Sequence, residues 1–403
     1  MREGWKTIKL EQVSEFQGGS QPPKSQFIDE PREGYIRLLQ IRDFKSDHRA
    51  VYIPITQKNR TCLSDDIMIG RYGASVGQIH RGKSGAYNVA LIKTIPNESI
   101  ISKDFFYLYL ISDLFQRPLS SVADRSAQDG FSKSDIALFE IMLPPLPEQK
   151  CIVAILDEAF EGIDRAVVNA KKNLANAREL FESYLNKVFT QKGEGWVETS
   201  LGEAFTFKGG GTPSKKVANF WNGNIPWVSP KDMKFDEIGT SIDKITAEAI
   251  SNSATSLIPI GAILIVVRSG ILAHTIPIGI TTCELSINQD IKALCPNSNL
   301  DKTFLRYLLL SKSKDILKLV TRGATVHRLS TESLKALRIS LPPLSQQKTI
   351  KLDLNNLSKK IQRLEAIYSQ KLTAFTELKQ SLLQKGFSGE LTADAPTKKE
   401  AVA

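Results

Sequence analysis

The chain alternates between two kinds of hydrophobic pattern. Short runs of β-branched and aromatic residues, separated by glycine and proline, fill the stretches before residue 143 and between residues 195 and 341. Such runs predict strands and turns. The clearest are Tyr35–Ile41, Ile67–Ile69, Ile225–Val228 and Ile263–Val267. Helical spacing of leucine and aromatic residues in Lys103–Phe115 and Lys302–Val320 adds a helix to each stretch. We therefore expect two domains of mixed α+β structure.

A long helical pattern follows each of these stretches. Apolar residues three and four apart begin at Ile152 and again at Ile350, and each series continues for about 40 residues, or about 60 Å of helix. A narrow apolar seam needs another helix against it, and the chain has two such seams. We expect the two helices to pair as a coiled coil. The alternative, in which each helix packs only on its own domain, leaves part of so long a seam uncovered.

The two halves of the chain repeat one another. Each half opens with Gly-Trp and a Gly-Gly turn and ends with Leu-Pro-Pro-Leu before its long helix. The matching segments are Gly4-Trp5 and Gly195-Trp196, Gly18-Gly19 and Gly209-Gly210, Leu143–Leu146 and Leu341–Leu344, and Glu148-Gln149-Lys150 and Gln346-Gln347-Lys348. A tandem repeat of this length indicates one architecture used twice. We expect domain 1 at residues 1–146, helix 1 at 147–194, domain 2 at 195–344, helix 2 at 345–389 and a flexible tail at 390–403.

The charge balance narrows the class of partner. The net charge is +10 and the pI is about 9.2, which favours a polyanion. The longest apolar run, Leu257–Val267, is too short to span a bilayer, so nucleic acid is favoured over membrane. The first ten residues lack the apolar core of a secretory signal, and the four cysteines form no C-x-x-C pair. We expect a cytoplasmic protein without disulfides or structural zinc.

Catalytic and cofactor motifs are missing from the sequence. The glycine-rich Lys208–Ser214 lacks the spacing of a phosphate-binding loop, and Gly70–Gly77 lacks that of a dinucleotide site. Glu148-x-Lys150 resembles the end of a metal-dependent nuclease motif, but the second half has Gln346-x-Lys348. Because the carboxylate is lost in an otherwise matching segment, we interpret these residues as a helix start. We expect no catalytic residues, no cofactor and no metal.

This combination of features resembles the specificity subunit of type I restriction-modification systems. The resemblance covers residues 4–389, and Phe207–Ser214 with Asn224–Val228 is similar to the family's second target recognition domain. Domain 1 departs from the pattern, because Gln21-Pro22-Pro23 replaces Thr-Pro-Ser. The resemblance implies two target recognition domains of mixed α/β structure, separated by two long helices that form an antiparallel coiled coil, with a pseudo-two-fold internal repeat. It also implies double-stranded DNA as ligand, two methyltransferase subunits docked on the helices, and restriction subunits bound through them.

The repeat by itself favours the same function. Two similar but non-identical basic domains joined by rigid helices are suited to two different short DNA sequences with an unread gap, as dimeric proteins read half-sites. One chain supplies both readers, so the target need not be palindromic. We expect a gap on the order of one helical turn of DNA.

Candidate DNA contacts follow from the chemistry of individual side chains. Arginine and glutamine donate bidentate hydrogen bonds to base edges, and lysine pairs with phosphate. Arg71-Tyr72 and Arg268-Ser269 lie at equivalent strand-to-turn positions, where the alternative role is a surface salt bridge. Lysines flank the Gly-Gly-Gly turn, whose missing side chains would let a phosphate strand approach the backbone closely. The alternative is a tight turn with solvated lysine side chains. The remaining candidates lie on predicted loops: Gln40, Arg42, Lys231, Arg322, His327 and Arg328. The full set is Gln40, Arg42, Arg71, Tyr72, Lys208, Lys215, Lys216, Lys231, Arg268, Ser269, Arg322, His327 and Arg328.

Two other functions stay open at the level of the sequence. A coiled-coil interaction scaffold with non-specific DNA affinity would explain the helices and the charge. A DNA-modifying enzyme with an unrecognised active site would explain the basic domains. The first would bind DNA without regard to sequence, and the second would modify DNA without a partner.

Overall fold

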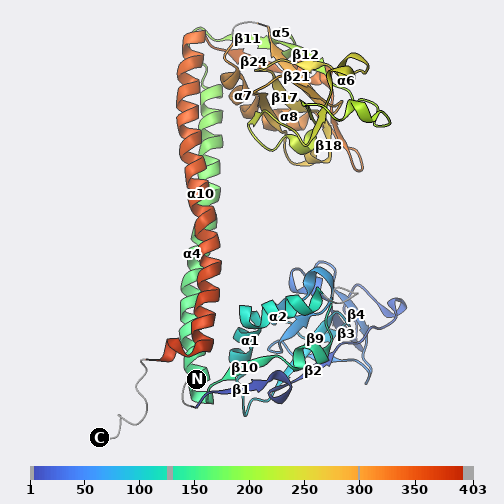
Figure 1. Ribbon diagram of the computed structural model, residues 1–403, viewed down its shortest axis with the longest axis vertical. Helices are drawn as coiled ribbons and strands as arrows, with labels where there is room; N and C mark the ends of the chain where they lie inside the picture. Colours follow the sequence, from blue (N-terminus) through green and yellow to red (C-terminus); the bar gives the residue numbers. More distant parts are fainter. Residues whose placement is uncertain (1–3, 125–129, 298–299, 394–403) are drawn as a thin grey trace. The chain divides into compact units, whose positions relative to one another are not determined.

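The computed structural model describes residues 4–124, 130–297 and 300–393 (Figure 1). The chain divides into two compact units, Met1–Lys171 with Ser369–Ala403, and Lys172–Tyr368. Each unit therefore contains one α+β domain and a part of both long helices, α4 (Leu146–Thr190) and α10 (Leu344–Ser388). The first part of α4 shares a unit with the last part of α10, and the reverse holds in the second unit, so the helices are antiparallel.

Domain 1 contains two four-stranded sheets. Their strand orders are β2-β9-β6-β7 and β4-β3-β8-β5, and a separate antiparallel pair, β1-β10, joins the two ends of the domain. The strands are β1 (Lys6–Lys9), β2 (Ser14–Gly18), β3 (Tyr35–Leu39), β4 (Val51–Pro54), β5 (Thr61–Cys62), β6 (Met68–Gly70), β7 (Ile79–His80), β8 (Gly85–Tyr87), β9 (Leu91–Pro96) and β10 (Glu140–Leu143). The helices are α1 (Lys103–Ile111), α2 (Asp113–Ala123) and α3 (Lys133–Ala137).

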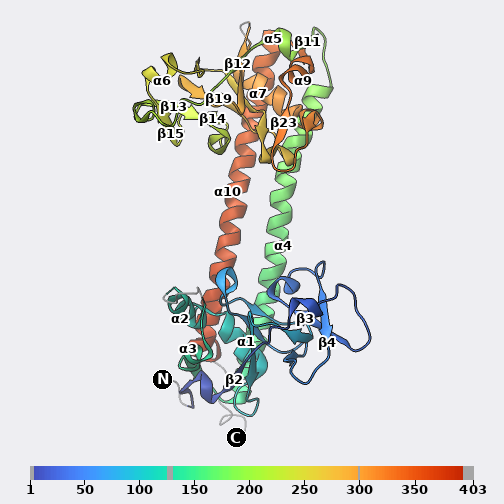
Figure 2. The same ribbon diagram turned by 90° about the vertical axis from the view of Figure 1, so that its right-hand side faces the viewer.

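Domain 2 uses the same strand order and extends it. The orders are β12-β21-β17-β19-β14 and β15-β13-β20-β16, with β11-β24 as the joining pair and a third sheet, β18-β23-β22 (Figure 2). The strands are β11 (Val197–Ser200), β12 (Phe205–Gly209), β13 (Ile225–Val228), β14 (Glu237–Ile238), β15 (Asp243–Ile245), β16 (Leu257–Ile258), β17 (Ile263–Val266), β18 (Arg268–Ser269), β19 (Ile278–Thr281), β20 (Leu285–Ile287), β21 (Ile291–Pro296), β22 (Val320–Thr321), β23 (His327–Leu329) and β24 (Arg338–Leu341). The helices are α5 (Leu201–Ala204), α6 (Ala247–Ser251), α7 (Lys302–Ser311), α8 (Ser313–Lys318) and α9 (Thr331–Ala336).

The internal repeat predicted from the sequence is therefore confirmed in the strand order. In both domains the second and third strands of the second sheet are parallel to one another. These strands are β3 and β8 in domain 1, where Leu38 pairs with Ala86, and β13 and β20 in domain 2, where Trp227 pairs with Ser286. The matched glycines have the same role twice. A Cβ on Gly19 would overlap the carbonyl oxygen of Asn88, and a Cβ on Gly210 would overlap that of Ile287. Only glycine lets the chain leave the first sheet so close to the second.

The predicted helix Lys103–Phe115 is wrong in its extent. Ser112 has an extended backbone (φ −80°, ψ 156°), and its buried Oγ donates to the carbonyl oxygen of Tyr109 at 2.7 Å, which ends α1. A second helix, α2, begins at the next residue. In domain 2 the predicted helix Lys302–Val320 is likewise divided at Lys312. Serine competes for backbone hydrogen bonds through its own side chain, an effect that apolar periodicity does not reveal.

The seam of the coiled coil follows a seven-residue repeat. In α4 the buried residues Leu156, Ile163, Ala170 and Ala177 are seven apart, and in α10 Leu354 and Ile361 are also seven apart. This spacing is typical of coiled coils, and alanine at two of the positions lets the partner helix approach closely. Ion pairs flank the seam within each unit, as Asp164 pairs with Lys379 and Arg178 with Glu365, both at 2.6 Å.

Each domain is attached to its helix by hydrogen bonds from two neighbouring side chains in the first turn of that helix. A buried glutamine in the first turn accepts a backbone N–H from the domain and donates to a carbonyl of the Pro-Pro segment. In domain 1 Gln149 accepts from Ser102 at 2.8 Å and donates to Pro144 at 2.9 Å, and Gln347 makes the equivalent bonds to Asp301 and Pro342. The residue before each glutamine accepts the indole N–H of the opening tryptophan, as described below.

The end of the chain differs from the expected tail. Glu390–Thr392 forms a turn of 3-10 helix, and the hydroxyl of Thr392 donates to Glu148 Oε1 at 2.8 Å. Residues 394–403, the rest of the expected tail, lie outside the described residues.

Candidate nucleic-acid interface

The three-stranded sheet β18-β23-β22 brings five of the predicted contact residues together. Strand β18 is labelled in Figure 1 and β23 in Figure 2. In the register between them Arg268 pairs with Arg328, and Ser269 with His327. Arg322 follows β22, in the turn that leads to β23. The sequence placed His327 and Arg328 on a loop, which is wrong, because both lie in β23. Residues opposite one another in an antiparallel pair share a face, so Arg268 and Arg328 lie on the same side of this sheet.

The two arginines would repel one another without a compensating charge. Asp290 supplies it to Arg268, whose Nε donates to Asp290 Oδ1 at 2.5 Å. The carboxylate is itself fixed, because Asn288 Nδ2 donates to Asp290 Oδ2 at 2.9 Å. Arg328 is exposed and forms no ion pair within the described part of the chain. The face therefore combines one compensated guanidinium group with one that is free to meet an anion.

The turn of this hairpin is tight. A Cβ on Gly323 would overlap the carbonyl oxygen of Val326, so glycine is required at this position. Arg322 is exposed beside it. His327 is half-buried, and its Nδ1 has no hydrogen-bond partner in any part of the chain that is described.

Domain 1 has an equivalent arginine with a different acceptor. Arg71 follows β6, and its Nε donates to the carbonyl oxygen of Phe131 at 2.9 Å. Its guanidinium group lies 4.9 Å from the centre of the Tyr72 ring, within the range of a cation–π contact. Tyr72 forms an antiparallel bridge with Gly130, as Ser269 pairs with His327 in domain 2. The segment 125–129 that precedes Gly130 lies outside the described residues.

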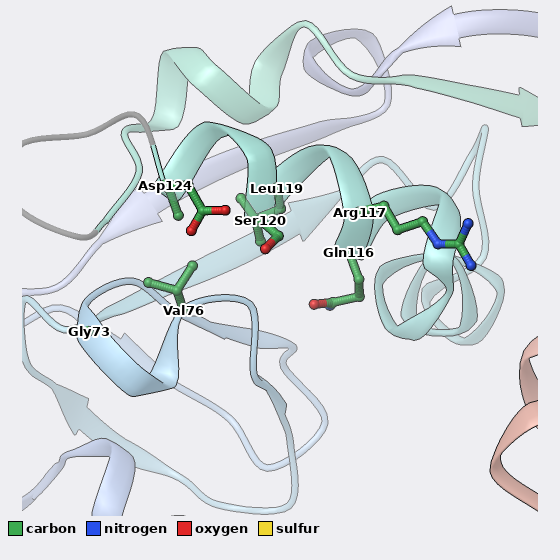
Figure 3. A pocket seen from close by; sticks show the side chains of 8 residues that line it. Gly73, Val76, Gln116, Arg117, Leu119, Ser120 and Asp124 are labelled. Atoms are coloured by element: carbon green, nitrogen blue, oxygen red, sulfur yellow. The ribbon is translucent and has the colours of Figure 1, made fainter. Parts of the chain in front are cut away.

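A hollow of about 450 Å³ lies beside Tyr72, between the turn Gly73–Ser75 and helix α2. Figure 3 shows Asp124 and Val76 on opposite sides of it, whereas Arg117 points away. The Gln116 amide closes one end by donating to the carbonyl oxygen of Gly77 at 2.9 Å. Asp124 places a carboxylate on the rim of the hollow, and a carboxylate there would repel a phosphate group.

The Gly-Gly-Gly turn has a different role from the one that the sequence suggested. We expected its missing side chains to let a phosphate strand approach. Instead Gly210 and Gly211 face the chain's own backbone at Ile287 and Ala254. The turn is further held by Trp227, whose Nε1 donates to the carbonyl oxygen of Gly211 at 2.9 Å. The glycines are therefore explained by internal packing.

The lysines around that turn remain exposed. Lys208 lies in β12, and Lys215 and Lys216 form the turn that follows Ser214. None of the three forms an ion pair among the described residues. Lys292 and Lys335 lie close by, since Gly209 packs against Lys292 and Lys335 lies over the Phe207 ring at 5.6 Å. Lys208, Lys292 and Lys335 thus lie near the β12 edge, and of these three the sequence had identified only Lys208.

Gln40, Arg42 and Lys231 lie on short 3-10 turns that the repeat places at equivalent positions. Asp43 and Asp232 cap these turns, accepting the backbone N–H of Gln40 at 2.6 Å and of Ser229 at 2.9 Å. Arg42 is exposed and donates to the carbonyl oxygen of Arg49 at 3.3 Å. Lys231 pairs with Asp243 at 2.7 Å, and this hydrogen bond raises its pKa. No contact among the described residues joins these three side chains to the arginine sites.

Glu148 and Gln346 share one structural role. Trp5 Nε1 donates to Glu148 Oε2 at 3.1 Å, and Trp196 Nε1 donates to Gln346 Oε1 at 3.2 Å. Either side chain offers the oxygen that an indole N–H requires, which explains why the carboxylate is dispensable. Across the described ranges, no group of three or more His, Cys, Asp or Glu side chains is arranged to hold a metal ion.

Reasoning from the sequence missed Asp290, the acceptor of Arg268. A signal for it exists, because Asn88 matches Asn288 in the repeat, whereas Ala90 stands where the second domain has Asp290. A carboxylate that is present in one copy of the repeat and absent from the other is the sequence signal that could have pointed to Asp290.

Comparisons with known proteins agree with this architecture. A family model described as the type I restriction modification DNA specificity domain matches residues 2–173 and 193–373. The specificity subunit of the type I restriction enzyme EcoR124I/EcoR124II from Escherichia coli is 37% identical over 205 residues, which is 50% of each chain. That match thus spans about half the length of the relative. The MjaVIII specificity subunit from Methanocaldococcus jannaschii is 24% identical over 371 residues, covering 86% of this chain and 84% of that protein.

Two solved structures share the fold. A chain from a study of complex assembly and conformational transition of the type I R-M system has a TM-score of 0.79 at 19% identity, covering 96% of this chain and 98% of that one. The HsdS subunit from Thermoanaerobacter tengcongensis has a TM-score of 0.54 at 18% identity, covering 97% and 98%. No helix within the described residues has the length and apolar character needed to cross a membrane.

Proposed function

Since the chain belongs to the family of type I restriction-modification specificity subunits, we propose that it reads a bipartite, asymmetric sequence in double-stranded DNA. Domain 1 reads one half of the target and domain 2 reads the other. We assign domain 1 to residues 1–146, domain 2 to residues 195–344, and the helices to the spacer between the two half-sequences.

One observation carries the proposal. The two domains have the same strand order, yet the polar side chains at their equivalent positions differ. Arg71-Tyr72 in domain 1 is replaced by Arg268-Ser269 in domain 2, and Ala90 by Asp290. A shared scaffold with different donors and acceptors at one place is what two readers of different base sequences require.

The chain acts without chemistry of its own in this proposal. It docks two methyltransferase subunits on the paired helices and, through them, the restriction subunits, in the cytoplasm where the host DNA lies. The matched first turns of α4 and α10 support two copies of one partner, because each domain meets its helix through the same glutamine and tryptophan contacts. The repeated helix offers each methyltransferase copy the same kind of surface.

Exchange of one domain tests the proposal. Residues 195–343 are replaced by the equivalent segment of a relative with a different target, and the hybrid is expressed with its methyltransferase subunits. Mapping of methylated adenines should show that one half-sequence changes while the other half and the gap stay fixed. The parent chain, mapped in the same host, is the control.

Three other results would contradict the proposal. Joint change of both half-sequences would mean that recognition arises from one shared surface. Sequence-independent binding would favour the interaction scaffold. Methylation or cleavage by the purified chain alone would favour an enzyme.

A further inference from the structure

We propose that Arg268 reads a guanine in the half-sequence bound by domain 2, and that Asp290 is its positioning residue. The inference rests on the proposed function and adds to it the identity of one base pair.

The guanidinium group of Arg268 has one edge occupied and one edge free. Nε donates to Asp290 Oδ1 at 2.5 Å. Among the described residues, neither Nη atom takes part in a hydrogen bond, and the side chain is 41% exposed. The two Nη groups are parallel donors in one plane. Guanine presents two acceptors, O6 and N7, side by side in the major groove, and this pair of donors matches them.

Asp290 is fixed before any ligand arrives. Its side chain is 19% exposed, its Oδ2 accepts from Asn288 Nδ2 at 2.9 Å, and its backbone N–H donates to Asn288 Oδ1 at 3.0 Å. The carbonyl oxygen of Asp290 also accepts the backbone N–H of Arg268 at 3.2 Å. An arginine side chain loses up to about 2 kcal/mol of rotamer entropy when it is immobilised. Because Arg268 is already held, less of that cost falls on DNA binding.

The carboxylate of Asp290 also favours guanine over phosphate as the ligand of Arg268. Asp290 cancels most of the charge of Arg268 at a distance, and it would repel a phosphate group placed a few ångströms away. Guanine carries no net charge, so its hydrogen bonds to the free Nη groups are little affected. A residue built to meet phosphate would keep its full charge, as the exposed Arg328 does.

Arg71 in domain 1 provides an internal reference. Its Nε donates to the carbonyl oxygen of Phe131, which is neutral, and Ala90 stands where domain 2 has Asp290. Arg71 therefore keeps its charge. Of these two matched arginines, Arg268 alone has a guanidinium group that is both fixed in place and paired with a negative charge.

Binding measurements on the intact complex test the inference. The full chain, assembled with its methyltransferase subunits, is titrated with duplexes in which each base pair of the mapped target is varied in turn. For Arg268→Lys, the preference for guanine at one base pair of the domain 2 half should fall from roughly 10- to 100-fold to near unity, because lysine lacks the planar fork. The domain 1 half should be read as before, which also shows that the variant is folded. Arg338→Lys, at the exposed first residue of strand β24, is the matched control.

Asp290→Asn separates positioning from a merely structural role. The amide oxygen can still accept from Nε, but the negative charge is lost. Binding to every duplex should strengthen at low salt, the salt dependence should become steeper by about one phosphate contact, and the guanine preference should weaken. A structural residue would change stability without changing the salt slope.

Three results would overturn the inference while leaving the proposed function intact. One is a bipartite target whose domain 2 half contains no G·C pair. Another is an Arg268→Lys complex with an unchanged guanine preference. The third is an Asp290→Asn complex with the salt slope and base preference of the wild type. A wild-type complex with no bipartite preference at all would overturn the proposed function and the inference together.

Discussion

The two recognition domains are alike where they are buried and different where they are exposed. Gly19 and Gly210 pack against equivalent carbonyl groups, and Gln149 and Gln347 make equivalent buried bonds. At the polar rim the domains diverge, with β14 and the hairpin β22-β23 described only in domain 2. Packing constrains a buried position to very few side chains, whereas an exposed position tolerates many. The difference supports the proposal that DNA specificity depends on exposed side chains, while the shared buried residues maintain the fold.

The helix caps differ between the domains at half-buried positions. Helix α1 is capped by Ser102, which accepts from Phe105 at 3.3 Å, and α7 is capped by Asp301, which accepts from Thr303 and Phe304 at 3.0 and 3.1 Å. Lys351 pairs with Asp301 at 2.6 Å. The repeat has Val153 at the position of Lys351, so the acid and its partner occur together in one domain only.

The largest effect is expected at the seam that both units share. Ile163 and Ile361 match in the repeat, and each is 7% exposed. Changing either to Asp buries a charge against apolar neighbours and should lower the free energy of unfolding of its own unit by about 3–5 kcal/mol. Denaturant unfolding followed by circular dichroism measures this loss.

Exposed positions on the same two helices provide the controls for the seam. Val168 is 63% exposed and Leu352 is 59% exposed, so Val168→Asp and Leu352→Asp should change stability by less than about 0.5 kcal/mol. If Ile163→Asp and Ile361→Asp were as mild as these controls, the seam would not stabilise either unit.

A medium effect is expected at the cap that differs between the domains. Burial acts to raise the pKa of Asp301, but the hydrogen bond from Lys351 and those from the helix N-terminus outweigh it, so the pKa is lowered. A lowered folded-state pKa adds stability above the unfolded value of about 3.9. That stability is lost as the pH falls through the folded-state pKa.

Asp301→Ser should therefore destabilise domain 2 by about 1 kcal/mol at pH 7 and by almost nothing at the lowest pH. Unfolding measured from pH 7 down to pH 3 gives the slope. The converse change, Ser102→Asp, should add less acid sensitivity to domain 1, because Val153 offers no cation. Equal pH slopes for the wild type and Asp301→Ser would show that the ion pair adds nothing.

The smallest effect on stability is expected at Glu148, which has Gln346 as its counterpart in the second half of the chain. Glu148→Gln keeps an oxygen for the indole N–H of Trp5, as Gln346 does for Trp196. Its new amide N–H group can donate to the Thr392 hydroxyl, which in the wild type donates to Glu148 Oε1, so the change should cost less than about 1 kcal/mol. DNA methylation by the assembled complex should also persist. Metal-dependent DNA cleavage by the wild-type chain that Glu148→Gln abolishes at unchanged stability would revive the interpretation of Glu148 as a metal ligand of a nuclease.

The sequence predicted the architecture well and the site only in part. Strand Ile225–Val228 and the start of α7 were placed correctly, because strong periodicity and turn residues act locally. The break at Ser112 was missed, since a buried serine that caps a helix has the same apolar neighbours as one inside a helix. His327 and Arg328 were assigned to a loop because a three-residue edge strand carries almost no periodicity.

The sequence by itself determined the repeat, the two long helices and the residue types available for DNA contact, because each of these depends on local spacing and composition. Only the tertiary structure decided which polar residues meet. Arg268, Asp290 and Arg328 are far apart in sequence and are joined by strand pairing, and the Gly-Gly-Gly turn faces Ile287 rather than solvent. Contacts of this kind depend on the register between distant strands, and no local pattern in the chain encodes that register.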